Sequence, residues 1–234
     1  GTLALPAGAA LGSAASGALL ICSNTTAVAL GSSGNTTPVV PVLIGAGANV
    51  TNTANALGTG FNGDITSADS AGSINANSSI TYGGNFQGFT GTLRVNSGTT
   101  RFSKGANGAT DLGSSNAVFI VNSSAPGLRP RNQNTVVHLG ALSGAGTLSG
   151  SQTTTSANTT TFSIGALNQS TTFGGLFLDN ITPTTNVAIV KVGSGTLTLT
   201  GNSPNSKVAV WVSLMFDEPK TNKPPPSLLV LTLS

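Results

Sequence analysis

The sequence predicts an all-β chain that stacks its strands into a β-solenoid and ends in a separate β tail. Three observations lead to this fold class. A Gly-Thr-Leu phrase returns at Gly91, Gly146 and Gly195, as a recurring strand-and-turn unit does. Apolar residues are mostly spaced singly between Thr, Ser and Asn, as in strands with one buried face. No window carries the apolar spacing of an amphipathic helix.

The composition indicates an ordered chain with few ionised groups. Thr, Ser, Asn and Gly make up 114 of the 234 residues, and only 6% of the residues are charged. Leu, Ile, Val and Phe still form about a quarter of the chain, above the ~20% below which disorder is expected. The net charge of +3 comes from nine basic residues spread thinly along the sequence. We therefore expect no nucleic-acid partner, because no cluster could neutralise a run of phosphates.

The N-terminal residues are apolar but broken. Pro6 and several glycines interrupt residues 3 to 21, so we expect a first β coil there instead of a transmembrane segment, and no targeting segment is evident. Cys22 is the only cysteine, which excludes an intrachain disulfide and favours a buried thiol over an intermolecular bridge.

The central part of the chain predicts the core of the solenoid. At about 20 to 25 residues per coil, like residues would stack on neighbouring strands about 4.8 Å apart. In the last copy of the phrase, Thr196, Thr198 and Thr200 would share the face opposite Leu197 and Leu199. The side chains expected to point inward are Leu93, Leu148, Leu197, Leu199, Phe86, Phe89, Phe162 and Phe173.

Two phrases carry a family resemblance. The first runs from Thr161 to Gly175, and the second, from Ile189 to Asn202, contains Lys191-Val-Gly-Ser-Gly-Thr-Leu-Thr-Leu-Thr-Gly. Together with weaker copies at 86–103 and 139–150, they resemble the autotransporter-associated β-strand repeat of bacterial surface proteins, over roughly residues 80 to 202. The resemblance implies a secreted, pectin-lyase-like, right-handed parallel β-helix presented outside the bacterial cell. It implies no catalytic activity.

The repeat pattern stops after residue 202. We therefore expect a β-solenoid-like domain over residues 1–202 and divergent capping or subunit-linking strands over residues 203–234. Pro219 and Pro224 to Pro226 separate a strongly β-forming run, 208–216, from a second candidate strand at the C-terminus. That strand either caps the last coil or pairs with an exposed edge of a neighbouring subunit. Its candidate contact residues are Leu228, Leu229, Val230, Leu231 and Leu233.

Chemistry-bearing residues are sparse. The six acids are scattered, and they are Asp64, Asp69, Asp111, Asp179, Asp217 and Glu218. His138 is the only histidine, and a half-buried strand position is its simplest interpretation. No calcium-binding glycine-aspartate repeat and no Gly-x-Ser-x-Gly elbow occur. We therefore expect no catalytic residue, no cofactor and no metal. Arg129 and Arg131, in the one basic loop, are candidate contacts for an anion or a sugar, and a solvated turn is the alternative.

These expectations combine into a functional hypothesis. The chain would be an extracellular or cell-surface structural or adhesive protein, not an enzyme, that self-associates into filaments by strand addition. The first alternative is a carbohydrate-binding or polysaccharide-lyase-like β-helix with a surface polysaccharide as partner. The second is an ice-binding protein, suggested by the alternating threonines from Thr196 to Thr200.

Overall fold

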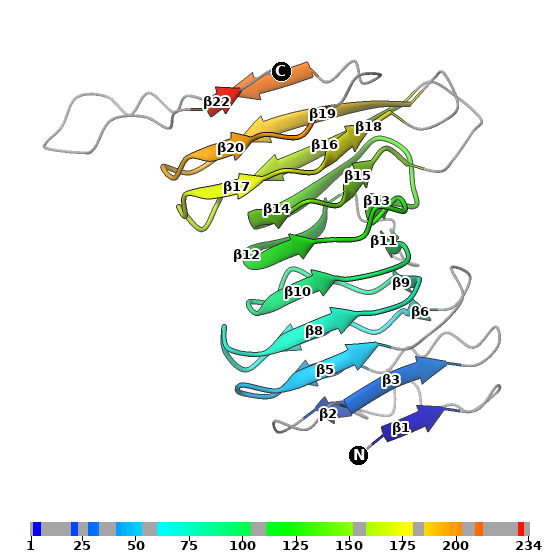
Figure 1. Cartoon of the computed structure of the whole chain (residues 1–234). Coiled ribbons are helices and arrows are strands. Elements are labelled where there is room, and N and C mark those ends of the chain that lie inside the picture. The colour runs from blue at the N-terminus through cyan, green and yellow to red at the C-terminus, as the bar shows by residue number, and fades with distance from the viewer. Residues whose placement is uncertain are drawn as a thin grey trace, which may run out of the picture.

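The protein is a stack of parallel β-strands. The structure, a computed structural model, describes residues 2–5, 20–22, 28–32, 41–52, 60–103, 111–151, 158–179, 185–202, 209–212 and 229–231. The described residues contain strands and turns but no helix, so they include no helical segment able to cross a membrane. Figure 1 shows the strands stacked in chain order from the N-terminus to the C-terminus. All pairs among the described strands are parallel, which confirms the predicted β-solenoid.

The pairings divide the solenoid into three faces. The first face is bridged by residues 85–90, where the Ile65 amide donates to the Asn85 carbonyl at 2.8 Å and the Ser114 hydroxyl donates to the Phe89 carbonyl at 2.7 Å. Its strands are β2 (Leu20–Cys22), β4 (Val42–Ile44), β7 (Ile65–Ser67), the first parts of β12 (Asp111–Val121) and β14 (Thr135–Gly144), β16 (Asn158–Ile164), β19 (Thr185–Lys191) and β21 (Ala209–Val212).

The other two faces follow in each coil. The second face consists of β1 (Thr2–Leu5), β3 (Val28–Ser32), β5 (Asn49–Asn52), β8 (Ser73–Ala76), β10 (Thr92–Val95), the second parts of β12 and β14, β17 (Thr171–Phe173), β20 (Leu197–Leu199) and β22 (Leu229–Leu231). The third face consists of β6 (Gly60–Phe61), β9 (Ile80–Tyr82), β11 (Thr100–Phe102), β13 (Leu128–Pro130), β15 (Thr147–Ser149) and β18 (Leu176–Leu178).

The coil length varies along the stack. The sequence separation of register partners gives the coil length. Among the described strand pairs it is shortest between β8 and β10, with Ser73 opposite Thr92, and longest between β20 and β22, with Leu197 opposite Leu229. The expected length of about 20 to 25 residues per coil lies between these two extremes. The spread follows from the corners, because a solenoid fixes the strand positions and leaves the loop lengths free.

The core runs inside the stack as columns of like residues. On the second face, Ile74, Leu93, Phe119 and Leu142 are register partners in turn, and all four are buried. All eight core side chains predicted from the sequence are buried, and they belong to one hydrophobic cluster. Aromatic rings stack within it, with ring centroids 4.9 Å apart for Phe86–Phe89 and 5.3 Å apart for Phe173–Phe177. Such pairs stabilise the core beyond their buried area.

The recurring phrase has a local explanation. A Cβ added at Gly91, Gly146 or Gly195 would lie 2.1, 2.5 or 2.3 Å from a carbonyl oxygen of the preceding coil, so only glycine fits at these corners. The copies nevertheless do not stack on one another. Leu93 and Leu197 lie on the second face, whereas Leu148 lies on the third. The phrase therefore marks the corner before a strand, and its interval does not measure the coil.

Candidate functional site

The regular stack is interrupted at β12. Ser114 pairs with Leu139 and Val118 pairs with Ala141, so residues 115–117 lie opposite the single residue Gly140. A bulge of this kind bends the strand and turns its side chains in new directions. This bulge marks the bend between the first and second faces.

Glycines and a buried serine hold the bulge in place. A Cβ on Gly140 would come within 2.4 Å of the Ser115 carbonyl oxygen, and a Cβ on Gly113, whose φ is +71°, would come within 2.4 Å of the His138 carbonyl oxygen. Both glycines are therefore needed for the close approach of β12 and β14. The Ser114 hydroxyl donates to the Phe89 carbonyl at 2.7 Å and accepts the Asn116 amide at 3.1 Å.

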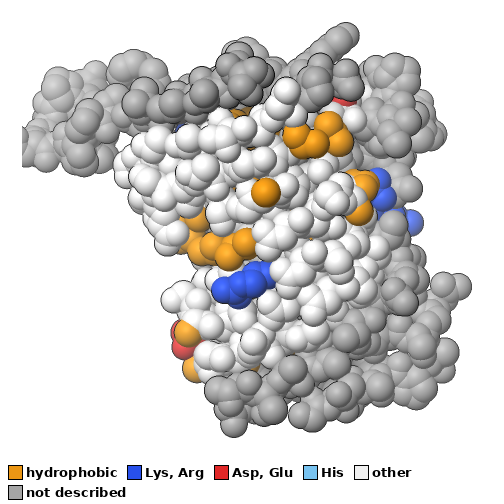
Figure 2. All heavy atoms as spheres, viewed as in Figure 1, with side chains coloured by type: hydrophobic (Ala, Val, Ile, Leu, Met, Phe, Trp, Pro, Cys, Tyr) orange, Lys and Arg blue, Asp and Glu red, His pale blue; other side chains and the backbone are white. Residues whose placement is uncertain are grey.

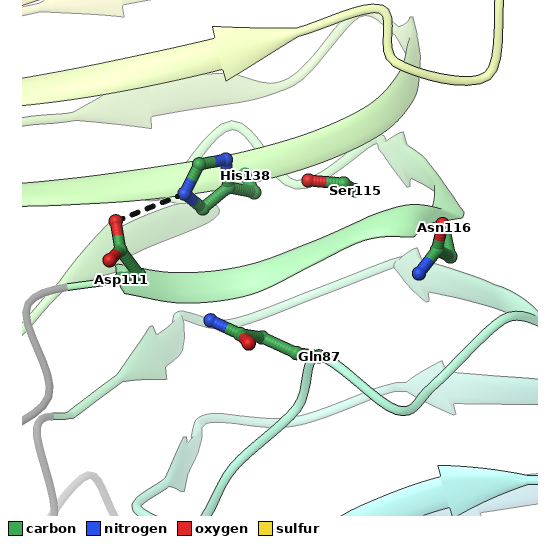
Figure 3. Close-up of a pocket in the computed structure, with 5 residues that line it drawn as sticks. All are labelled: Gln87, Asp111, Ser115, Asn116 and His138. Carbon is green, nitrogen blue, oxygen red and sulfur yellow. Dashed lines mark hydrogen bonds and ion pairs between the residues drawn. The ribbon is translucent and has the colours of Figure 1, made fainter.

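An open pocket of about 310 Å³ lies beside the bulge. Its lining comes from three successive levels of the first face: residue 87 before β10, residues on β12, and one residue on β14. Figure 3 shows these side chains around the pocket. They are Gln87, Asp111, Ser115, Asn116 and His138.

The lining contains one hydrogen bond between side chains. His138 Nε2 lies 3.1 Å from Asp111 Oδ1, with side-chain exposures of 26% for His138 and 54% for Asp111. A contact this exposed contributes at most about 1 kcal/mol, so its main effect is to orient the imidazole. The hydrogen bonds among described residues include none between the Ser115 hydroxyl and the His138 imidazole.

The other described acids accept backbone amides. Asp64 accepts the Asn85 amide at 2.8 Å, Asp69 accepts the Ala71 amide at 2.9 Å, and Asp179 accepts the Val187 amide at 2.8 Å. Asp217 and Glu218 lie outside the described residues. Among the residues that the structure describes, no three His, Cys, Asp or Glu side chains gather as metal ligands do.

A second polar feature is a row of arginines on the third face. Arg101 and Arg129 are register partners on β11 and β13, each 8% exposed, and Arg131 follows on the same face of the chain. The Arg101 Nε donates to the Thr81 hydroxyl at 3.1 Å. Burial and the charges of Arg129 and Arg131 lower the pKa of Arg101 to about 10, and burial also lowers the pKa of Arg129. With a pKa of about 10, the Arg101 guanidinium remains charged at neutral pH.

The structure thus adds a third arginine to the pair expected from the sequence. Arg101 and Arg129 lie one coil apart in the chain, so only the register of β11 and β13 could reveal that they are neighbours. We refer to Arg101, Arg129 and Arg131 as the arginine row. The sequence likewise gives no reason to expect a contact between Asp111 and His138. The register of β12 and β14 brings these two side chains together.

A third feature is the pair of strands at the C-terminal end. β21 pairs with β19, with Val190 opposite Trp211, and β22 pairs with β20, with Thr198 opposite Val230. Three of the predicted contact residues, Leu229, Val230 and Leu231, therefore form a parallel strand on their own chain. Leu228 and Leu233 lie outside the described residues. The side chain of Cys22 on β2 is not described.

Comparison of the chain with protein-family models, with curated proteins and with solved structures gave no match. The β-solenoid fold therefore stands on the strand pairings. The autotransporter-associated resemblance stays a prediction from the sequence phrases.

Proposed function

We propose that this protein is an extracellular or cell-surface structural or adhesive component of a bacterium, and that it self-associates end to end by strand addition. The observation that supports this proposal is the state of the end strands. Among the described strands, β1 pairs only with β3, β21 only with β19, and β22 only with β20. Each end of the solenoid thus carries parallel strands with one backbone edge left without a described partner.

An unpaired strand edge is a template for another chain. Because the two ends of the solenoid differ, a contact between the last coil of one copy and the first coil of the next would be heterologous, and such contacts extend without closing. The low charge of the chain favours this arrangement, since uncharged coils approach with little repulsion. The C-terminal tail then has two alternative roles. It either caps its own last coil, as in the pairing of β22 with β20, or donates β22 to a neighbouring subunit.

Truncation separates these roles. Electron microscopy and light scattering at fixed protein concentration would compare the full chain with a chain lacking residues 219–234, which removes β22, and with one lacking residues 203–234, which removes β21 as well. Fibres from the full chain and soluble, folded subunits from the shorter chains would support strand addition. A full chain that stays monomeric would refute self-assembly, and unchanged fibres without residues 219–234 would eliminate β22 as the donor strand.

The arginine row favours a second candidate function, binding of an acidic surface polysaccharide. Guanidinium groups bind carboxylate and sulfate in a bidentate manner, and Arg131 is the exposed member of the row. Arg101 and Arg129, each 8% exposed, would add positive charge near an anionic group bound at Arg131. Retention on immobilised polygalacturonate would test this idea. Arg131→Gln should weaken retention, whereas Arg94→Gln on the half-exposed side of β10 should not. Equal effects of the two changes would mean that retention depends on the net charge of the protein and not on the arginine row.

Ice binding is not proposed. On the second face, the outward row runs through Thr51, Asn75, Arg94, Ile120 and Ser143 as successive register partners. Further along this face, Thr172 and Thr198 are register partners. The five preceding positions contain only one threonine, so the row gives no support to a ladder of threonine hydroxyls on every coil. Figure 2 shows a surface in which charged and apolar side chains are few and interspersed among uncharged groups.

A further inference from the structure

We propose that the pocket beside the β12 bulge binds a neutral saccharide through pairs of adjacent hydroxyl groups. This proposal stands apart from the filament proposal and from the arginine row, because it concerns a different face and an uncharged ligand. The bulge is the starting observation. Here three residues of β12 oppose one residue of β14, and two glycines are required to fit them. Bulges of this kind are over-represented beside functional sites, where they redirect side chains.

The chemistry of the lining selects the class of ligand. The five side chains supply two amides, a hydroxyl, a carboxylate and an imidazole, with no apolar side chain and no Lys or Arg. An apolar ligand would find no aliphatic side chain in this lining and would leave its polar groups without partners. A phosphate or a uronate would face Asp111 without a compensating guanidinium or ammonium group. A ligand rich in uncharged hydroxyl groups suits this set, because every lining residue can donate or accept a hydrogen bond.

The hydrogen-bonding groups of the pocket are available. The side-chain amides of Gln87 and Asn116 and the Ser115 hydroxyl make no hydrogen bond to the rest of the described chain, and Asp111 uses only Oδ1, toward His138. Carboxylate and amide groups are planar and present two polar atoms side by side. They therefore match two hydroxyl groups on neighbouring carbons of a sugar ring in a bidentate manner.

The dimensions set the size of the ligand. The lining spans three levels of the first face, from residue 87 through β12 to β14, which corresponds to about 10 Å at the usual strand spacing. The volume of about 310 Å³ lies at the small end of ligand pockets. We therefore expect one or two sugar rings in the pocket, and weak affinity for an isolated sugar, because the pocket is open to solvent.

The experiment uses the full chain and saturation-transfer NMR with a panel of glucose, galactose, mannose, cellobiose and lactose, each at up to about 10 mM, where a millimolar complex is detectable. Polygalacturonate serves as the anionic comparison. We expect at least one neutral sugar to bind. Gln87→Ala and Asn116→Ala should each weaken that binding about fivefold, as expected for the loss of one hydrogen bond. Gln169→Ala removes an exposed amide on another loop and should leave binding unchanged.

Two results would overturn the proposal. One is the absence of any signal from the neutral panel, and the other is equal weakening by Gln87→Ala and Gln169→Ala. Both Gln87 and Asn116 are exposed, so the variants should keep the β signal of the wild type in circular dichroism. Fibre formation is read separately by microscopy, so loss of sugar binding with intact fibres rejects the pocket without touching the filament proposal.

Discussion

Replacement of Leu93 by alanine tests whether side chains along β10 alternate between the core and the outer side. Leu93 is 0% exposed and lies between its register partners Ile74 and Phe119, both buried. The change removes three carbon atoms, which at about 0.8 kcal/mol each amounts to roughly 2.4 kcal/mol of lost transfer free energy. The cavity left between two fixed coils adds to this, so the free energy of unfolding should fall by about 2 to 5 kcal/mol.

Thr92→Ala is the matched control, because the adjacent residue points to the opposite side of β10 and is half-buried. It should change the free energy of unfolding by no more than about 0.5 kcal/mol. Urea unfolding followed by far-ultraviolet circular dichroism gives both values, provided that the m-value is the same in the two variants. A cost below about 1 kcal/mol for Leu93→Ala together with a larger cost for Thr92→Ala would refute the register.

The remaining predictions concern the last coils. Leu197→Ala should lower the free energy of unfolding by about 2 to 5 kcal/mol and Thr198→Ala should leave it nearly unchanged, because Leu197 is buried and Thr198 only half-buried. In thermal melts, Gly175→Ala should destabilise strongly, since its Cβ would lie 1.9 Å from a carbonyl oxygen of the preceding coil, whereas Gly174→Ala, whose nearest contact is 3.3 Å away, should be tolerated. Burial lowers the pKa of Lys191 from 10.5, so the unfolded chain holds this proton more tightly. Stability should therefore rise with pH from the lowered pKa up to 10.5, and Lys191→Met should remove that slope in urea titrations.

Opposite outcomes would locate the error. Equal costs for Leu197→Ala and Thr198→Ala would mean that β20 does not present alternate faces. A stable Gly175→Ala variant would mean that the coils are further apart at this corner. An unaltered pH slope in Lys191→Met would place the amine in water instead of the interior.

Much of the fold could be predicted because it depends on local pattern. Alternation alone places Leu197 and Leu199 inside and Thr198 and Thr200 toward solvent, and the structure confirms each of these positions. Parallel stacking then follows from the absence of helices and from glycine-bracketed strands. Lys191 also lies inside. Its register partner Ile164 is buried, and Lys191 itself is 1% exposed. The Lys191 Nζ donates there to the Gly193 carbonyl at 2.9 Å.

The candidate sites could not be predicted in the same way. The Asp111–His138 contact joins two successive coils, because the register of β12 and β14 places Asp111 opposite Val136, two residues from His138. Neither this register nor the bulge that follows it can be read from composition and spacing, since both depend on how two coils pack. The one cue in the sequence was a pair of glycines, Gly113 and Gly140, at positions where a strand normally carries side chains.

The direction of the backbone hydrogen bonds has a mechanical consequence. They join each coil to the next and so run along the stack, and the two termini lie at its opposite ends (Figure 1). A pulling force applied through the termini loads these bonds one coil at a time, starting from an end, instead of shearing many strands together. Each detached coil would release the length of one solenoid repeat, about 20 to 30 residues, which at about 3.4 Å per residue gives roughly 70 to 100 Å of slack. The molecule would therefore lengthen in stages under tension instead of breaking at once.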